Sequence, residues 1–430
     1  MEQLLHYVWK HKLFPLSPLT TTWHQAVEVI DPGLHNRNAG PDFFNAKIKL
    51  NGTLWVGNVE IHDKASDWYV HGHDKDERYD NVILHVCGTI DVEAKNSKGE
   101  PLVQLQLDIP DNVSKHYQEL LSIDQYPPCY QIIPSLTRLT VHSWMSALQT
   151  ERLSQKTDAI EARVKQCNGD WENAYFVTLA RNYGFGINGD AFEQWAYHLP
   201  LRAVDHHRDD LFQIEAIFLG QAGLLELNTI PERYQKDALN DGYFSRLRNE
   251  YLYLSHKFSL QPMDYKQWRF LRLRPQNFPH IRISQLANLY YNRRAGLSQL
   301  LEASTVKEAK QVLSTSVTEY WETHYTFGST SIRNEKHLSP FSLNLLITNT
   351  VVPILFAYGR HRGEEKYCDR AFDFLEELKA ENNHIVRMWK ECGLPVENAG
   401  DSQALIQLKK EYCDRKECLR CRIGYEYLKR

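Results

Sequence analysis

The pair Asn51-Gly52 constrains the fold more than any other feature of the chain, because it separates two extended runs, residues 43–50 and 53–62. Asn-Gly is the preferred pair for a two-residue hairpin turn, in which both central residues need a positive φ. The two runs are therefore predicted to be neighbouring antiparallel strands of one sheet.

The hairpin brings two carboxylates together at one end of the sheet. In the register that the turn sets, Asp42 falls opposite position 61, so that Asp42 and Glu60 become neighbours. Two carboxylates in this arrangement suit a hard divalent cation, Mg²⁺ or Mn²⁺, which prefers oxygen ligands and activates water. The alternative interpretation is an ordinary hairpin that carries surface carboxylates.

The residues around this hairpin resemble the motifs of the PD-(D/E)XK nuclease superfamily. Members of that superfamily place Asp at the start of one strand and Glu-x-Lys on the next, around a metal that activates water. Pro41-Asp42 corresponds to the first element and Glu60-x-His62 to the second, with His62 where the superfamily usually has Lys. The resemblance implies that Asp42 and Glu60 bind the metal, and that His62 or the nearby Lys64 activates water or steadies the phosphate. A histidine lacks the permanent charge of lysine, so a decayed, inactive site is also consistent.

Several polar residues near the hairpin are candidate accessories to this site. Arg37 precedes the motif and suits a phosphate, and Asn38 could orient a water molecule. His85 lies on the predicted strand 82–87, which we expect beside the hairpin. His71 and His73 alternate in a polar stretch and could bind zinc, although a histidine-rich surface loop has the same sequence pattern.

Composition indicates a soluble globular protein with room for more than one core. The 430 residues are 42% hydrophobic and 24% charged, and the net charge of −4 gives no general attraction to nucleic acid. We expect a cytoplasmic protein without membrane contacts, since residues 1–6 lack a signal-peptide pattern and no apolar run approaches membrane-spanning length. Most of the eight cysteines should then be thiols or metal ligands.

The pattern along the chain predicts an α+β protein in two parts. Residues 1–125 read as a mixed β-sheet domain with one leading helix, and the proline-rich stretch 122–135 reads as a boundary. Residues 136–430 read as an all-helical domain. Besides the hairpin, we expect a helix over 4–14 and strands over 22–30, 82–87, 90–95 and 102–108; long expected helices include 136–166, 283–302 and 340–358.

The C-terminal segment contains a second candidate metal site. Cys413, Cys418 and Cys421 are closely spaced, and Cys392 lies upstream. Thiolates at such spacing can bind zinc or an iron–sulfur cluster, in a role that we expect to be structural. Such a segment resembles the cluster that staples some helicase-linked nucleases of the PD-(D/E)XK superfamily. The alternative is a helical end that carries free thiols.

Arginines and aromatic residues alternate between Trp268 and Arg282, with Arg293 and Arg294 on the next helix. This mixture suits phosphate contacts and base stacking, so DNA or RNA is a candidate partner. It suits equally well a helical core rimmed by arginines.

The whole chain resembles an uncharacterised bacterial family, the domain of unknown function 2851. The resemblance supports the layout and implies no activity, and three hypotheses follow. They are a metal-dependent nuclease, an inactive nucleic-acid-binding protein, and a helical scaffold for a protein partner that the sequence does not identify. The runs that carry the resemblance are 38–43, 57–62, 213–216, 220–223, 274–279 and the terminal cysteine segment.

Overall fold

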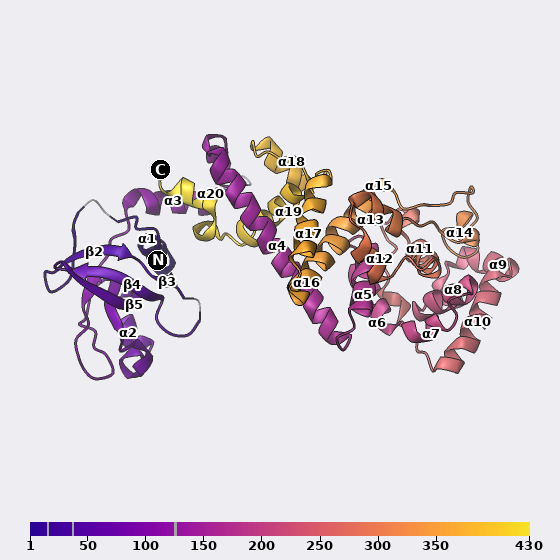
Figure 1. The fold of residues 1–430 in the computed structure, drawn as a ribbon, viewed down its shortest axis with the longest axis horizontal. Helices are drawn as coiled ribbons and strands as arrows, with labels where there is room; N and C mark the ends of the chain where they lie inside the picture. Colours follow the sequence, from indigo (N-terminus) through magenta and orange to yellow (C-terminus); the bar gives the residue numbers. More distant parts are fainter. Residues whose placement is uncertain (15–16, 37, 124–126) are drawn as a thin grey trace. The chain divides into compact units, whose positions relative to one another are not determined.

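The computed structural model describes residues 1–14, 17–36, 38–123 and 127–430, which form two compact units (Figure 1). Unit 1 comprises Met1–Trp144, Met388–Leu394 and Leu408–Arg430, and unit 2 comprises Met145–Arg387 and Pro395–Gln407. A mixed sheet followed by many helices confirms the α+β class. The C-terminal segment returns to unit 1, whereas the sequence pattern had grouped it with the helical part.

Unit 1 is built on a seven-stranded mixed sheet with the strand order β1-β2-β4-β5-β6-β7, and β3 pairs with β4. The pairs β2/β4 and β4/β5 are antiparallel, whereas β5/β6 and β6/β7 are parallel. The strands are β1 Leu19–Thr20, β2 Ala26–Asp31, β3 Leu34–His35, β4 Phe43–Leu50, β5 Thr53–Lys64, β6 Val82–Thr89 and β7 Gln104–Gln106.

The predicted hairpin is confirmed, with one change of register. Asn51 and Gly52 both have positive φ, and β4 pairs with β5 as the turn dictates as far as Ala46. A bulge then follows at Asn45, whose φ is 56°, and beyond it Phe43 pairs with Val59. Asp42 is therefore level with Glu60, and the expected pairing with position 61 is wrong by one residue.

The strand expected over 90–95 is absent from the described structure, where Lys95 makes only an isolated bridge. A side chain replaces the missing strand partner. The amide of Gln104 donates to the carbonyl oxygen of Val92 at 3.2 Å and accepts from the backbone N–H of Ala94, also at 3.2 Å. Residues 92–94 thus meet their hydrogen-bonding needs without a sheet neighbour.

Helix α1 (Glu2–Lys10) and the connection from β5 to β6 both contact the central strand β5. In the parallel register Glu60 lies beside His85 and His62 beside Cys87, so these four side chains share one face of the sheet. The connection contains α2 (Asp67–Val70) and the 3₁₀ turns η1 (His73–Lys75) and η2 (Glu77–Tyr79). It places Trp68 against His85, with ring centroids 5.1 Å apart, and therefore covers this polar face.

The rest of unit 1 is helical. Helix α20 contacts both α3 and η3, which brings the end of the chain next to residues that precede the long helix α4. The expected helix over 4–14 ends earlier, at Lys10. These elements are α3 Asp111–Ser122, η3 Tyr130–Ser135, the π-helical turn η8 Leu408–Cys413, η9 Cys418–Arg420 and α20 Arg422–Leu428. Two helices are divided between the units: α4 Arg138–Gln166, which continues into unit 2 at Met145, and α18 His384–Glu391, which enters unit 1 at Met388.

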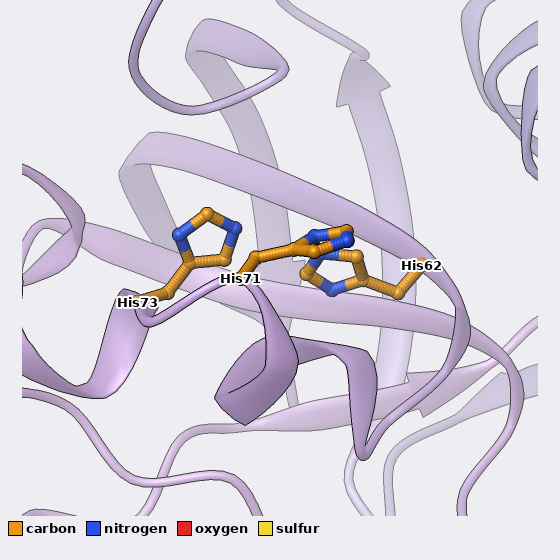
Figure 2. Close-up of side chains that lie close together, drawn as sticks. All are labelled: His62, His71 and His73. Atoms are coloured by element: carbon orange, nitrogen blue, oxygen red, sulfur yellow. The ribbon is translucent and has the colours of Figure 1, made fainter.

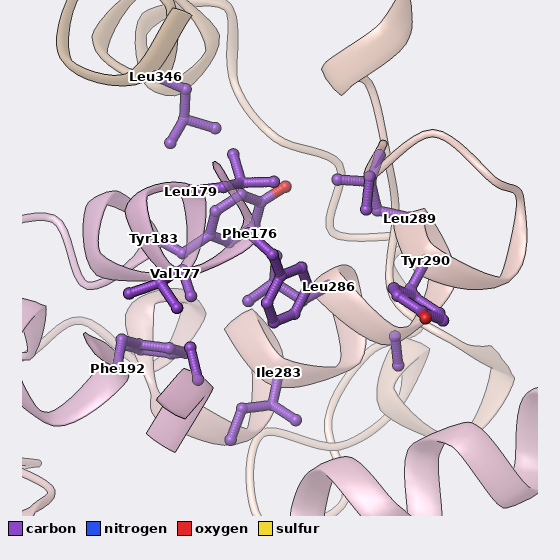
Figure 3. Close-up of a cluster of buried hydrophobic side chains, with 14 of the residues drawn as sticks. Phe176, Val177, Leu179, Tyr183, Phe192, Ile283, Leu286, Leu289, Tyr290 and Leu346 are labelled. Carbon is purple, nitrogen blue, oxygen red and sulfur yellow. The ribbon is translucent and has the colours of Figure 1, made fainter. Parts of the chain in front are cut away.

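Unit 2 packs its helices around one continuous apolar core, part of which is shown in Figure 3. Phe176, Phe192 and Leu286 are among its most buried members. The helices are α5 Trp171–Tyr183, α6 Gly189–His198, α7 Leu201–Asp205, α8 Leu211–Gln221, α9 Glu232–Asn240, α10 Tyr243–Phe258, α11 Pro279–Tyr291, α12 Leu297–Glu302, α13 Val306–Leu313, α14 Glu319–Glu322, α15 Pro340–Leu346, α16 Val352–Arg362, α17 Glu365–Glu377 and α19 Ala399–Gln407; short turns are η4 Leu227–Thr229, η5 Tyr265–Gln267, η6 Pro275–Asn277 and the π-helical η7 Ile347–Val351.

Two of the long expected helices differ from the structure. The helix expected over 283–302 is divided into α11 and α12, because the chain turns at Arg293, whose φ is 58°. The stretch Pro340–Arg362 is continuous and passes the length and hydropathy criteria for a membrane span, so the expectation that no apolar run is that long is wrong. Of the most apolar 18-residue stretch of this segment, 67% is buried inside the structure, as in a core helix.

A buried histidine makes the stability of unit 2 depend on pH. His280 is 2% exposed among the rings of Phe270, Trp321 and Phe327, and neither ring nitrogen has a hydrogen-bond partner among the described residues. Burial lowers the pKa of His280 from 6.5 to about 3. Between pH 6.5 and about 3, the unfolded chain therefore binds a proton at His280 that the folded chain does not bind. The free energy of unfolding decreases as the pH falls through this range.

We predict that His280→Phe reduces the pH dependence of urea-induced unfolding of unit 2. Between pH 6 and 4 the wild type should lose about 1.4 kcal/mol per pH unit more than the variant, the equivalent of one proton. His256→Gln, at an exposed position on α10, should leave the slope unchanged. Equal slopes for wild type and His280→Phe would contradict the assignment.

Candidate metal centre

Asp42 and Glu60 hold each other in place through the backbone. The N–H of Asp42 donates to Oε2 of Glu60 at 2.9 Å, and the N–H of Ile61 donates to Oδ2 of Asp42 at 3.0 Å. The bulge in β4 produces this reciprocal arrangement, because it brings Asp42 level with Glu60. Glu60 keeps its second oxygen, Oε1, for other partners.

Three histidines lie close together (Figure 2), and two of them, His62 and His73, contact Glu60. His62 comes from β5, whereas His71 and His73 come from the connection that covers the polar face. One ring nitrogen from each of the three lies within 4.8 Å of the others. His62 and His73 are buried and His71 is exposed, so the cluster reaches solvent on one side.

Glu60 is a candidate fourth ligand beside two of these histidines. Its Oε1 lies 3.3 Å from Nε2 of His73 and 3.7 Å from Nε2 of His62, and Nε2 of His62 lies 3.1 Å from Nδ1 of His71. Three imidazole nitrogens and one carboxylate oxygen form a donor set typical of zinc and other transition metals, whereas Mg²⁺ prefers oxygen ligands alone. The Mg²⁺ or Mn²⁺ expected at Asp42 and Glu60 stays a prediction.

A second layer of side chains orients His62. Its Nδ1 lies 2.9 Å from Nε2 of His85, which is fully buried and lies 3.3 Å from Sγ of Cys87. The ring of Trp68 packs against His73 at a centroid distance of 5.2 Å. Such outer contacts fix the ring orientation and tautomer of a histidine that binds metal. His85 is thus placed as a supporting residue, in line with its expected accessory role.

Burial keeps the imidazoles of His62 and His85 neutral. Burial, followed by the nearby histidines, lowers the pKa of His62 to about 3. Burial likewise lowers the pKa of His85 to about 4. Only a neutral imidazole can donate its lone pair to a metal, so His62 is ready to bind at neutral pH without losing a proton.

The two carboxylates have pKa values shifted in opposite directions. Burial and the neighbouring charge of Asp42 raise the pKa of Glu60, against the hydrogen bond from His73. Burial opposes ionisation of Asp42 as well, but His6 and the N–H of Ile61 outweigh it and lower the pKa of that carboxyl. The interaction with Asp42, from which Nε2 is 3.3 Å away, in turn raises the pKa of His6 despite burial. Asp42 and His6 therefore form an ion pair near neutral pH.

The other expected site residues lie outside this centre or outside the described residues. Lys64 shares the face of β5 with His62 but is exposed, and its charge acts on Asp91 instead. Asn38 is exposed, and its N–H donates to the side chain of Asn36. Arg37 lies outside the described residues.

A cavity of about 660 Å³ opens beside Asp42 in unit 1. Its walls come from α1, the segment before β4, α3 and residues 415–420. The C-terminal wall is largely basic, although Arg415 pairs with Glu411 and Arg420 with Glu417. The charged side chains that line the cavity are Glu2, Lys10, Asp42, Arg415, Lys416, Glu417 and Arg420.

The C-terminal thiols gather with a different fourth cysteine from the one expected. Cys413, Cys418 and Cys421 line a small cavity together with Cys129, whereas Cys392, just beyond α18, is absent from its lining among the described residues. Cys129 is therefore a candidate for the fourth member, and the role expected of Cys392 stays a prediction. Cys129 stands alone in a proline-rich stretch, so only the fold reveals its neighbours.

His6 was also missed, because it lies on an apolar helix where a single histidine has no distinctive pattern. His6 is far from Asp42 in the sequence, and the two residues meet only because α1 packs on the sheet. The helical periodicity of residues 4–14 was the only sequence signal, and it did not single out His6.

The comparison with known protein families now has a structural context. Residues 2–384 match the family described as Protein of unknown function (DUF2851). The chain belongs to this family. No curated protein and no solved structure matches the chain. The family description names no activity, and the match ends before the C-terminal cysteines, so family membership assigns no chemistry to either cluster of candidate ligands in this DUF2851 protein.

We predict that the protein binds Zn²⁺ or Co²⁺ through Glu60 and the three histidines. His71→Ala and His73→Ala should each weaken metal affinity by at least about 100-fold, and His85→Ala by about 10- to 100-fold, since outer-layer partners tune affinity by that amount. Isothermal titration calorimetry measures these changes. His142→Ala, at an exposed position on α4, is the matched control. Equal affinities for the control and His71→Ala would exclude the centre.

Proposed function

We propose that this DUF2851 protein is a metal-dependent hydrolase that cleaves phosphodiester bonds, with its active site at Asp42, Glu60 and the adjacent histidines. The observation that carries the proposal is the position of Asp42. One side of this residue adjoins Glu60 and its histidine partners, and the other side lines a cavity with a basic wall. A metal centre, an ionised carboxylate and an anion-binding surface thus meet at one place.

Glu60, His62, His71 and His73 would hold the metal. A bound zinc-class metal supplies a water molecule of lowered pKa and polarises a phosphoryl oxygen. Zinc in catalytic sites can expand to five ligands, and the exposed position of His71 leaves one side of the centre accessible to a water molecule as the fifth ligand. The metal site proposed here therefore contains mostly histidine nitrogens, in place of the Mg²⁺ or Mn²⁺ site that the sequence predicts at Asp42 and Glu60.

Asp42 and His6 would act on protons beside the metal. The lowered pKa of Asp42 keeps it ionised at neutral pH, so it can accept a hydrogen bond from the attacking water. The raised pKa of His6 lets it carry a proton at 3.3 Å from Oδ2 of Asp42. A pair of groups with opposite shifts suits general base and general acid roles.

The basic wall favours an anionic substrate. Arg415, Lys416 and Arg420 come from one short segment and face the cavity with Lys10 of α1. Cationic side chains at such a surface neutralise phosphates and supply affinity that does not depend on sequence. The resemblance of Asp42 and Glu60-x-His62 to PD-(D/E)XK motifs points to the same substrate class, DNA or RNA.

Cleavage of labelled single-stranded DNA, duplex DNA and RNA tests the proposal, with Zn²⁺, Mn²⁺ or Mg²⁺ supplied in turn. We expect cleavage with a zinc-class metal. Glu60→Gln should reduce it to background because the variant lacks a metal ligand, and Asp42→Asn should reduce it by at least about 100-fold because the variant lacks the base. Gel electrophoresis of the products measures the rates.

Glu28→Gln is the matched control, because Glu28 is an exposed carboxylate on the same sheet that pairs with Lys49. Its rate should equal that of the wild type. Cleavage that survives both Asp42→Asn and Glu60→Gln would place the activity elsewhere. Metal binding by the wild type without cleavage of any substrate would refute the phosphodiesterase function while retaining the metal centre.

A second candidate function, nucleic-acid binding without cleavage, is favoured by a cavity in unit 2. This cavity of about 510 Å³ is lined by Arg272, Arg274, Arg282 and Lys336, and by no acidic residue among those described. The Arg282 guanidinium lies 4.4 Å from the ring centroid of Phe185. Burial lowers the pKa of Arg282 to about 10, which leaves it charged at neutral pH. Uncompensated positive charge beside aromatic rings suits a phosphate backbone with stacked bases.

We predict that Arg272→Ala combined with Arg274→Ala weakens binding of single-stranded DNA or RNA. For every phosphate that the double variant no longer neutralises, the slope of log affinity against log salt should fall by about 0.7. Fluorescence anisotropy at several salt concentrations measures both quantities. Arg333→Ala, at an exposed arginine paired with Glu322 outside the cavity, should change neither. Unchanged binding by the double variant would contradict this candidate.

A further inference from the structure

Four thiols from separate parts of unit 1 surround one small cavity. Cys129 directly precedes η3, Cys413 ends η8, Cys418 begins η9 and Cys421 directly precedes α20. The cavity between them has a volume of about 10 Å³. A volume of about 10–15 Å³ holds one water-sized atom, which is also the scale of a single metal ion.

These thiols are unusual core residues. Cys129, Cys418 and Cys421 are buried. Thiols make only weak hydrogen bonds, whereas a metal cation would stabilise the sulfurs that line this cavity as thiolates.

Close backbone packing brings the last two cysteine segments together. A Cβ atom at Gly424 would lie 2.1 Å from the carbonyl oxygen of Cys418, so only glycine permits this approach of α20 to η9. The approach places Cys418 and Cys421 at the same cavity. The backbone is therefore shaped to gather the thiols.

We propose that Cys129, Cys413, Cys418 and Cys421 bind a thiophilic metal through four thiolates, as a zinc ion or an iron–sulfur cluster. Metal–sulfur bonds replace the four S–H bonds, and the protons are released to solvent. Four protein ligands leave no open position, so the centre is structural.

The centre would connect the region before α4 to the C-terminal segment of the chain. Residues 415–420 lie between Cys413 and Cys421 and form the basic wall of the cavity beside Asp42. Metal binding at the thiols would therefore fix Arg415, Lys416 and Arg420 in place. This consequence is independent of the chemistry at Glu60.

Metal analysis of protein purified without oxygen or chelators tests the proposal. We expect one zinc per chain at the thiols, or iron with acid-labile sulfide and visible absorption if the centre is a cluster. Cys129→Ser and Cys413→Ser should each abolish this metal, whereas Cys392→Ser and Cys368→Ser should retain it. His71→Ala removes metal only from the histidine centre and so distinguishes the two sites.

Cobalt substitution keeps the test valid if the serine variants fail to fold. Co²⁺ bound to four thiolates gives intense sulfur-to-cobalt charge-transfer absorption, which histidine and carboxylate ligands do not give. We expect this absorption in the refolded wild-type chain, and Cys392→Ser should show it equally. Its absence from the wild type, together with no zinc or iron that depends on Cys129, would overturn the proposal. Equal metal loss in Cys392→Ser and Cys129→Ser would overturn the assignment of the fourth ligand.

Discussion

The candidate site depends on two reciprocal hydrogen bonds, from the N–H of Asp42 to the Glu60 carboxylate and from the N–H of Ile61 to the Asp42 carboxylate. They require that Asp42 be level with Glu60, which the hairpin achieves only through the bulge at Asn45. With one oxygen of Glu60 fixed by a backbone N–H, its other oxygen faces His62 and His73. The sheet therefore aims a carboxylate into a histidine cluster, and the covering connection supplies the remaining ligands.

Burial determines the chemistry that this arrangement can perform. The sheet and Trp68 remove His62 and His85 from water, which keeps them neutral and able to face a cation. The same burial would be costly for isolated polar groups, but these rings contact one another in a continuous row. Asp42 lies at the edge of this buried region, where it lines the open cavity. A buried centre beside an accessible carboxylate is an arrangement suited to hydrolysis.

Much of the local structure could be predicted from the sequence, because it depends on short-range signals. Asn51-Gly52 specifies a turn, and the alternation along β4 and β5 specifies a hairpin, so the proximity of Asp42 and Glu60 follows. The bulge at Asn45 could not be predicted, since it depends on how Asn58 meets the backbone N–H of Asn45 at 3.3 Å. The sequence marked His71 and His73 as candidate zinc ligands but not their place beside His62 and Glu60, because they reach these residues only through the folded connection.

Long-range assembly was the least predictable feature. Cys129 and Cys413 are neighbours because α20 returns to α3 and η3, and no periodic pattern in the sequence encodes that return. His6 likewise reaches Asp42 only through the packing of α1. Local patterns therefore identified candidate residues, whereas the tertiary fold selected which of them act together.

The central claim is that Glu60, His62, His71 and His73 form one metal centre. Anomalous X-ray diffraction from crystals soaked in Zn²⁺ tests it most directly, because the signal locates the ion without any assumption about activity. The account predicts a peak about 2.0–2.2 Å from a ring nitrogen of each histidine and from Oε1 of Glu60. A fully occupied zinc elsewhere, with the three rings still in contact only with one another, would contradict it.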